Sequence, residues 1–442
     1  MSRAWIVGGA LRDELLGRPV TDVDIAVEGD PAGPARALAR ERGGPVFRLS
    51  EEFGAWRVIE PGRERVWDFS PLQGETIEED LRRRDFSVNA MARPREGGEL
   101  IDPLGGRADV ESRTLRVLGP EAYASDPLRA LRLARFVAEL GFRADAQTER
   151  LTRAAAPRVT DASAERVFAE LRRLVIAEGV LHGLALADRL GLLEAVLPEL
   201  AALHGVEQSH YHHLDVYGHT IEVLEQLIGL DSEASGRLRD VLDEPLADEL
   251  TRGQALRIGA LLHDVGKPPT HARRPDGRVT FIGHDRLGEE MIRGICRRLR
   301  TSERLGAFLG ALARHHLVLG FLVHERPLDR RAVYRYLTRT APVEVEVTML
   351  SCADRLATRG RKADAAIPVH LELAGLLMEA ALDWRAHGPP APLVRGDELA
   401  GELGIEPGPE LGRLLGELEE ARYAGEVTTR GEAVALARRL SG

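Results

Sequence analysis

Two aspartates near the start of the chain are spaced to share a metal site. Asp22 and Asp24 lie two residues apart in a β-branched run, and alternate residues of a strand point to the same face of its sheet. Two or three such carboxylates can anchor a pair of Mg²⁺ ions, which activate a hydroxyl and hold a triphosphate with its leaving pyrophosphate. Asp68, in a later strand-like run, is the third candidate. An isolated pair is more often a solvated strand end, so the neighbouring residues decide.

A pair of glycines precedes these aspartates. Gly8 and Gly9 follow the apolar run Ala4–Val7 and lead into a helix-like segment that carries Arg12. Glycine lets the backbone approach a triphosphate, and the first turn of the following helix offers free N–H groups to it. The segment "AWIVGGALRDELLGRPVTDVDIAV" therefore predicts a strand, a turn, a helix and a second strand around a phosphate-binding site.

The spacing of these residues follows a known signature. The string G-G-x-x-R-D-x-x-x-G-x-x-x-x-D-x-D resembles that of the class II tRNA nucleotidyltransferases and bacterial poly(A) polymerases. Segments similar to the family's second to fifth motifs follow in the same order: "RRDFSVNAMA", "DPLGGRADVESRTLRVLG", "SDPLRALRLARF" and "SAERVFAELRRL". The resemblance, which covers residues 1–200, implies an enzyme that adds C, A or both from CTP and ATP to the 3′ end of tRNA. It implies release of pyrophosphate and no nucleic-acid template.

The second motif implies a group of nucleotide-binding side chains. In the resembling family, Arg83 or Arg84 would bind ribose and phosphates together with Asp85 and Asn89. Without the motif, an exposed run of arginines would be the more common explanation.

The fourth motif predicts a polar ridge on one side of a helix. The ridge residues recur every three positions and are Asp126, Arg129, Arg132 and Arg135. A carboxylate accepts from an exocyclic amino group, and a guanidinium donates to ring nitrogens and carbonyls. Asp126 and Arg129 are therefore predicted to read an incoming C or A. The family usually has Glu before that aspartate, whereas this chain has Ser125, which removes a charge that could orient the arginine.

Histidines concentrate in the middle of the chain. Eleven of the fourteen lie between His204 and His324, which favours metal binding over surface scatter. The string "LLHDVGKP", with "YGHTIEVL" upstream and "SCADRLA" downstream, resembles the HD superfamily of metal-dependent phosphohydrolases over residues 207–356. The resemblance implies four metal ligands: His219, His263, Asp264 and Asp354. It implies phosphate contacts from Lys267, His284 and His315.

Imidazole and carboxylate ligands together suit Mn²⁺, Ni²⁺, Co²⁺ or Fe²⁺, and a water made acidic by such an ion could attack a phosphate ester. The alternative is a helical scaffold that keeps the ligands without turnover. Four further histidines are given no role: His210, His212, His213 and His316.

The expected fold class is α+β. We predict an N-terminal nucleotidyltransferase head over residues 1–125, a small mixed sheet with helices, with strands at Ala4–Val7, Val23–Val27, Trp56–Ile59 and Val66–Phe69. An all-helical neck (126–205), an HD domain (206–385) and a helical tail (386–442) should follow. Apolar spacing predicts neck helices at Asp126–Leu140 and Ser163–Ile176, the second opening like an N-capped helix.

The segment 386–396 is rich in Gly and Pro and is predicted to be a linker. The tail beyond it is predicted to be a helical hairpin, which in resembling proteins would embrace the tRNA body. Its apolar positions are Leu399, Leu403, Leu411, Leu414, Leu415 and Leu418.

Composition limits the possible partners. A net charge of −10 argues against coating nucleic acid through bulk positive charge, although a local groove could still bind an RNA end. Cys296 and Cys352 are too few for a disulfide framework and are given no role. With no uninterrupted apolar stretch of about 18 residues, we expect no membrane partner and a cytoplasmic location. The oligomeric state is left open.

Three alternative functions share some of these features. A poly(A) polymerase has the same head and would extend generic RNA with many adenosines. A silent RNA-binding protein would keep the fold, although intact Asp22 and Asp24 argue against it. In the third alternative, HD hydrolysis is the main activity.

The segment before the second motif bears on how many nucleotides are added. In the resembling CCA-adding and A-adding enzymes, a longer flexible loop before the Glu-Glu-Asp-Leu helix helps to reset the template arginine from C to A. Here only Phe69–Glu75 is available, too short to act across the cleft. This predicts a CC-adding specialist, with a complete CCA-adding enzyme as the fallback.

Overall fold

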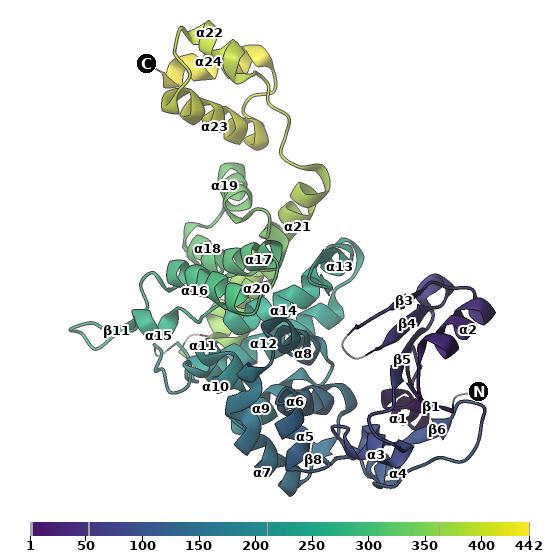
Figure 1. Ribbon diagram of the computed structural model, residues 1–442. Helices are drawn as coiled ribbons and strands as arrows, with labels where there is room; N and C mark the ends of the chain where they lie inside the picture. The colour runs from purple at the N-terminus through teal and green to yellow at the C-terminus, as the bar shows by residue number, and fades with distance from the viewer. Residues whose placement is uncertain (1–2, 52–53, 210, 362, 442) are drawn as a thin grey trace. The chain divides into compact units, whose positions relative to one another are not determined.

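The computed structural model describes residues 3–51, 54–209, 211–361 and 363–441. The chain divides into two compact units, Met1–Val196 and Leu197–Gly442, which are described separately. The first unit holds the large sheet, and the second is almost entirely helical (Figure 1).

A six-stranded mixed sheet forms the start of the first unit, as predicted. Its spatial order is β3-β4-β5-β2-β1-β6. The strands are β1 (Ala4–Val7), β2 (Asp22–Val27), β3 (Val46–Arg48), β4 (Trp56–Ile59), β5 (Val66–Pro71) and β6 (Ala92–Pro94). Only the central pair β2–β5 is parallel among these, and its register places Asp24 directly beside Asp68.

Alternate residues of β2 point to opposite faces of the sheet, so some pack in the core under α2 and others face the cleft side. Ile25 and Val27 belong to a core with α2 (Ala32–Arg42), which covers one face of the sheet. Ala26 belongs to a second core with α3 (Ile77–Arg82). Because alternate residues of a strand point the same way, Asp24 lies on the face of Ala26 and away from α2.

Helices form most of the remaining first unit. They are α1 (Gly9–Leu15), α4 (Gly106–Glu111), α5 (Pro120–Ser125), α6 (Arg129–Leu140), α7 (Ala146–Ala155), α8 (Ala164–Ile176), α9 (Val180–Arg189) and α10 (Leu192–Val196). Helix α6 packs against α8 and α9. The neck is not purely helical, because the two-residue strand β7 (Thr114–Leu115) pairs in parallel with β8 (Arg143–Ala144) of the neck.

One of the two predicted neck helices begins later than predicted, and the other begins as predicted. Helix α6 begins at Arg129 and not at Asp126, which is extended with φ −151° and ψ 97°. Pro127 follows Asp126, and the residue before a proline is pushed out of the helical region. Ser163 takes the N-cap position of α8 as predicted, although in the described coordinates its side chain makes no capping hydrogen bond.

Five packed helices form the centre of the second unit. They are α12 (Val216–Glu233), α14 (Arg252–Leu262), α16 (His284–Arg298), α17 (Glu303–His315) and α20 (Glu344–Ala357). Smaller helices surround them: α13 (Gly236–Asp243), α15 (Lys267–Thr270), α18 (Val318–Leu322) and α19 (Arg330–Thr340). Two very short hairpins, β9–β10 at 245–251 and β11–β12 at 272–280, were not predicted.

Two helical segments, Glu303–Glu325 and Ala363–His387 (α21), are long and apolar enough to cross a membrane by length and composition. Each apolar run is interrupted by charged residues, such as Arg314 in the first. Helix α17 packs against α14 and α16, and α21 packs against α19 and α20. Half of the apolar window of the first segment and a third of that of the second are buried.

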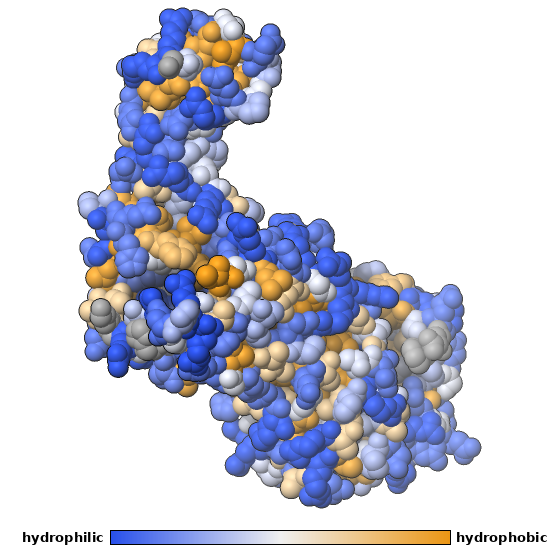
Figure 2. Space-filling model, turned by 90° about the vertical axis from the view of Figure 1, so that its left-hand side faces the viewer, coloured by the Kyte–Doolittle hydropathy of each residue, from blue (hydrophilic) through white to orange (hydrophobic). Residues whose placement is uncertain are grey.

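The tail contains three helices where a hairpin was predicted. They are α22 (Gly396–Leu403), α23 (Pro409–Ala424) and α24 (Arg430–Leu440). All six predicted apolar leucines contribute to their common core, and α24 adds Ala433, Val434 and Ala437. Apolar side chains among these helices are visible as orange in Figure 2. The linker is shorter than predicted because α21 continues to His387.

Candidate active sites

A polar cleft of about 440 Å³ lies in the first unit on the Asp24 face of the sheet. Most of the predicted transfer residues line it: Gly8, Gly9, Arg12, Asp22, Asp24, Arg84, Asp85, Asn89, Arg129, Arg132 and Arg135. Phe136 and Arg173 also line it and were not predicted as site residues. Phe136 lies four positions after Arg132, whose guanidinium is 5.6 Å from the centre of the Phe136 ring, so helical spacing could have indicated it.

The carboxylates of the cleft lie in the first half of β2. Desolvation by the surrounding protein raises the pKa of Asp24, and the charges of Asp68 and Asp22 add to this effect while Arg84 opposes it. Asp68 is engaged elsewhere, because both of its oxygens accept hydrogen bonds of 2.7 Å from Arg57. Asp22 and Asp24 are thus the carboxylates presented to the cleft, with Asp68 beside them. Crowded carboxylates of this kind suit a hard divalent cation.

Gly8 brings the backbone close to the second motif. Its φ is +75°, and a Cβ atom there would lie 2.9 Å from Arg84 Nη1 and 3.3 Å from Asp24 Oδ2. A side chain would therefore displace the groups that form the cleft. Arg84 is the arginine that lines the cleft, whereas Arg83 is exposed. The structure thus favours Arg84 over Arg83 as the predicted phosphate or ribose contact.

A hydrogen-bonded chain holds the arginines in position. Arg12 Nη1 donates to Asn89 Oδ1 over 2.8 Å, and Asn89 Nδ2 donates to Asp85 Oδ1 over 3.0 Å. Arg132 Nη1 lies 3.1 Å from Asp85 Oδ2. Burial alone would raise the pKa of Asp85, but the charge of Arg132 and the hydrogen bonds from Asn89 and the Phe86 N–H outweigh it and lower the pKa. Asp85 is therefore an anionic anchor for the cleft.

The ridge residues of the fourth motif differ in their surroundings. Arg129 Nη1 donates to the carbonyls of Arg84 and Ala122, each over 3.2 Å, and to Ser125 Oγ over 3.3 Å. Ser125 therefore still contributes an acceptor to Arg129 in place of the family's usual glutamate.

Arg135 and Asp126 have protein partners. Arg135 is 1% exposed, and its guanidinium pairs with Glu170 at 2.5 Å and Glu139 at 2.7 Å. Asp126 accepts from Arg166 Nη2 over 2.6 Å. Arg129 and Arg132 are also held by protein partners, and both line the cleft, where a nucleotide could meet their remaining donors.

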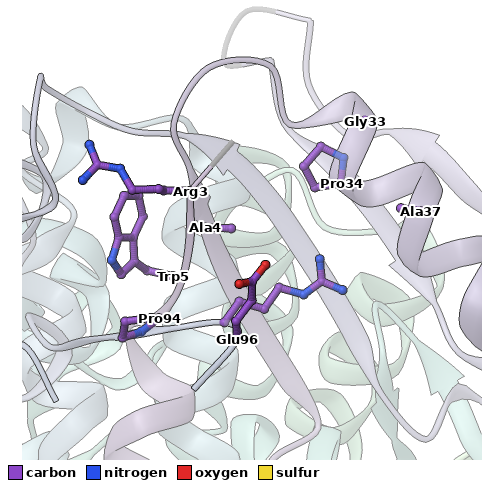
Figure 3. A pocket seen from close by; sticks show the side chains of 9 residues that line it. Arg3, Ala4, Trp5, Gly33, Pro34, Ala37, Pro94 and Glu96 are labelled. Atoms are coloured by element: carbon purple, nitrogen blue, oxygen red, sulfur yellow. The ribbon is translucent and has the colours of Figure 1, made fainter. Parts of the chain in front are cut away.

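A larger cavity of about 1010 Å³ is lined by residues of β1, β6 and α2. Figure 3 shows the side chains that line it. Its described lining shares no residue with the transfer cleft and consists of Arg3, Ala4, Trp5, Gly33, Pro34, Ala37, Pro94, Arg95 and Glu96. We assign the transfer chemistry to the smaller cleft because that cleft holds the carboxylates.

The four predicted metal ligands of the second unit meet in its centre. His219 Nε2 lies 3.0 Å from Asp354 Oδ1 and 3.9 Å from Asp264 Oδ2, and His263 Nε2 lies 3.2 Å from Asp264 Oδ2. The ligand atoms of His219, His263 and Asp354 all lie within 4.8 Å of one another. Imidazole and carboxylate ligand atoms that face one another at this spacing fit a divalent transition metal.

His316, and not His315, faces this cluster. His316 is buried with its Nε2 3.8 Å from Asp264 Oδ1, whereas His315 lies beside Arg314 and Arg339, which together with burial lower its pKa. The prediction of a phosphate contact from His315 is therefore corrected to a cluster position for His316. Consecutive helical residues point about 100° apart, so only one of the two can face the core. The buried positions Leu305, Leu309 and Leu312 continue to His316 at helical spacing, a signal that the sequence already carried.

A cavity of about 760 Å³ opens onto this cluster. Lys267 and His284 line it as predicted, and Lys267 Nζ lies 2.6 Å from Asp264 Oδ2 and 2.7 Å from Gln208 Oε1. His212 also lines it and contacts His219 edge to face at 5.0 Å between ring centroids. Burial lowers the pKa of His212 to about 3.

His213 pairs with a carboxylate: its Nε2 lies 3.3 Å from Glu222 Oε2. His210 is outside the described residues.

The sheet, the Gly-Gly turn and the paired aspartates together define a nucleotidyltransferase head. Residues 4–116 match the family described as poly A polymerase head domain. Residues 141–203 match a probable RNA and SrmB-binding site of polymerase A, and residues 216–359 match the HD domain.

Known relatives cover nearly the whole chain. An A-adding tRNA nucleotidyltransferase of Deinococcus radiodurans is 41% identical over 442 residues, covering 99% of this chain and 95% of that protein. A CC-adding tRNA nucleotidyltransferase of Thermus thermophilus is 37% identical over 440 residues, covering 98% and 92%. A solved structure, the Thermotoga maritima CCA-adding enzyme complexed with tRNA, shares the fold with a TM-score of 0.64 at 21% identity, covering 100% and 92%. The chain belongs to the tRNA nucleotidyltransferase family.

Proposed function

We propose that this protein adds cytidine, adenosine or both to the 3′ end of tRNA, using CTP and ATP and releasing pyrophosphate. The supporting observation is a single cleft in which Asp22 and Asp24 face Arg129 and Arg132 of α6. An open cleft with carboxylates on one side and fixed arginines on the other suits a nucleoside triphosphate and an RNA end.

Different residues of the cleft would bind the metal ion, the phosphates and the base. Asp22 and Asp24 would hold Mg²⁺, which when bound supplies positive charge beside the triphosphate. The free N–H groups after Gly8, together with Arg84, would bind phosphate oxygens. Arg129, held by two backbone carbonyls and Ser125, would present its remaining donors to the base edge.

The finer proposal is that the enzyme adds two cytidines and stops. Strand β5 ends at Pro71 and α3 begins at Ile77, so the intervening segment is short. It is also tied down: Gln73 N–H donates to Asp80, and Glu75 N–H donates to Glu79 Oε2 over 2.9 Å. A segment held in this way has little reach to change the position of an arginine on α6. The relatives include both CC-adding and A-adding enzymes, so nucleotide number must be measured.

Two tRNA substrates test this proposal. One ends at the discriminator base and the other already carries CC, and each is incubated with CTP, ATP or both. We expect two cytidines on the first and no adenosine on the second. Completion of CCA by this protein alone would overturn CC specificity and leave the transferase assignment standing. Long adenosine tails would instead support the poly(A) polymerase alternative, which the tRNA-specific relatives do not favour.

For the second unit we propose phosphohydrolase activity on a 2′,3′-cyclic phosphate or a phosphomonoester. His219, His263, Asp264 and Asp354 would hold Mn²⁺, Ni²⁺, Co²⁺ or Fe²⁺, which supplies an acidified water for cleavage of the P–O bond. Lys267, in the wall of the cavity, would bind the phosphate. Cleavage of such esters with one of these ions is expected. Failure with all four would favour the alternative of a scaffold without turnover.

Two further properties of the enzyme are its cellular location and the contact of its tail with tRNA. We propose a cytoplasmic location, which is supported by the relatives named as tRNA nucleotidyltransferases. The three-helix tail would contact the tRNA body, as proposed for related tails.

A further inference from the structure

Helix α19 of the second unit carries a row of arginines on one side. Arg331, Arg335 and Arg339 are spaced by four residues, so they follow one another along the helix at steps of about 6 Å. We call these three residues the α19 stripe. The helix is held in the second unit by the buried residues Ala332, Val333, Tyr336 and Leu337.

Acidic residues of the tail cover one end of the α19 stripe, where α23 packs against α19. The guanidinium of Arg331 lies 2.8 Å from Glu426 and 3.2 Å from Glu417. The guanidinium of Arg335 lies 2.7 Å from Glu420. The tail therefore already presents anionic oxygens to these two arginines, which indicates the kind of ligand that they fit.

The other end of the α19 stripe is open. Arg339 is exposed and has no ion-pair partner among the described residues. It lines the cavity that opens onto the histidine cluster, together with Arg355. The stripe therefore runs from the tail contact to the wall of this cavity.

The ion pairs between the stripe and the tail can be exchanged. The side chain of Arg335 is 57% exposed, and that of Glu426 is 49% exposed. Ion pairs in contact with water contribute little to stability and are weakened by salt. Phosphate oxygens accept the same paired hydrogen bonds from a guanidinium as carboxylate oxygens do. Phosphates can therefore replace the glutamates without the loss of a buried interaction.

A single RNA strand is the polyanion that fits these features. A row of arginines suits a ligand with repeated negative charges, because each phosphate along the strand can meet one guanidinium. Phe321 lines the same cavity as Arg339 and is 67% exposed, so its ring offers a face on which a base can stack. An acidic protein would use the arginines and leave this ring without a partner. The relatives named as tRNA nucleotidyltransferases also favour RNA.

We propose that the α19 stripe binds the phosphates of single-stranded RNA, and that the glutamates of the tail compete with this RNA for Arg331 and Arg335. Aromatic packing keeps the tail beside α19 while the ion pairs are exchanged. The ring centroids of Tyr334, Trp384 and Tyr423 lie 5.5 to 6.1 Å apart. RNA binding at the stripe requires neither nucleotide addition in the first unit nor hydrolysis in the second.

Photocrosslinking tests where the RNA lies. The full chain is irradiated with an oligouridylate that contains 4-thiouridine, and the modified peptides are mapped by mass spectrometry. We expect crosslinks to α18 and α19. Glu417→Gln with Glu420→Gln should raise their yield several fold, because two competing charges are removed, and Arg335→Gln with Arg339→Gln should lower it several fold. Glu410→Gln is the matched control, because Glu410 is an exposed carboxylate of α23 that makes no ion pair with α19 among the described residues.

The opposite signs of these effects separate competition from misfolding, because a poorly folded variant would not gain a contact mapped to α19. Salt dependence gives a second measurement: Arg339→Gln should lower the slope of log affinity against log salt concentration by about 0.7, the value for one phosphate of a single strand. No crosslink to α18 or α19, or a yield in the glutamate variant no higher than in the parent, would overturn the inference. Cytidine addition to tRNA is measured on the same proteins, so failure of the proposed transferase would be recorded separately.

Discussion

The two candidate sites solve the binding of metal and phosphate in opposite ways. In the transfer cleft, Asp22 and Asp24 are exposed in the first half of a strand, and the opposing wall is made of arginines. In the second unit, His219, His263 and Asp264 are almost completely buried among packed helices. An exposed carboxylate pair suits Mg²⁺, which keeps several of its waters, and leaves room for a large substrate. Buried imidazoles suit less strongly hydrated transition metals.

Electrostatics sharpens this contrast. The pKa of Asp24 is raised because desolvation and neighbouring carboxylates outweigh Arg84. The pKa of Asp354 is lowered, because His219 and His263 outweigh the effect of burial. The arginines of the cleft therefore do not fully offset the desolvation of Asp24, whereas the histidines of the second unit offset the burial of Asp354.

The largest expected effect follows from removing a transfer carboxylate. Asp24→Ala should lower nucleotide addition by at least about a thousandfold, because a cation anchor is lost at the charge-developing phosphate. The double variant His263→Ala with Asp264→Ala should keep addition near the parent rate. Rates are measured with labelled CTP, and circular dichroism checks folding. Loss of addition in a folded double variant would show that the two sites are not independent.

Nucleotide selection should respond next. Asp126→Ala is expected to weaken discrimination among C, U and A more than it weakens nucleotide binding, because losing one base-edge partner costs about 1–3 kcal/mol of discrimination. Arg166→Ala removes the ion-pair partner of Asp126 and serves as the comparison. Single-nucleotide assays measure selection and KM together. Unchanged selection in Asp126→Ala would remove Asp126 from base reading.

Acidification should weaken the binding of Mg²⁺ at the transfer site. A carboxylate binds Mg²⁺ only when deprotonated, and a raised pKa means that Asp24 loses this form at a higher pH than an ordinary aspartate. As the pH is lowered, the apparent affinity for Mg²⁺ in nucleotide addition should therefore begin to fall above the pH range in which an ordinary aspartate is protonated. Mg²⁺ titrations at several pH values measure it. An affinity that falls only within the range of an ordinary aspartate would contradict the surroundings described for Asp24.

The smallest effect is expected at Ser125. Ser125→Ala removes one of three acceptors of Arg129 Nη1 and leaves two backbone carbonyls, so addition should change by only a few fold, in line with about 0.5–1.5 kcal/mol for one hydrogen bond. Ser125→Glu restores the residue usual in the family. Comparable kcat/KM values for the serine and glutamate forms are expected. A hundredfold loss in Ser125→Ala would show that Ser125 alone orients the arginine.

The strands and most site residues could be predicted because their signals are local. The bounds of β1 and β4 agree with those predicted from apolar alternation and turn residues. Asp22 and Asp24 share a face because of strand geometry alone. The pairing of Asp68 with Arg57 depends on the β4–β5 register, which local sequence does not specify.

The contrast between His315 and His316 illustrates a different limit. The motif predicted only that a histidine in this part of the chain lies near the metal ligands. The helical spacing of the buried residues from Leu305 onward was needed to predict that His316 is the one that faces inward. Asp126 shows a third limit, because its partner Arg166 is forty positions away and is reached only through helix packing.

The central claim is that the exposed carboxylate cleft extends tRNA ends. A tRNA lacking CCA and an unstructured RNA of the same length should be incubated separately with CTP and ATP, and their products sized at single-nucleotide resolution. The account predicts a short discrete extension of the tRNA, abolished by Asp24→Ala, and little extension of the unstructured RNA. No extension of tRNA by the folded protein, or a long ladder of adenosines on the unstructured RNA, would contradict it.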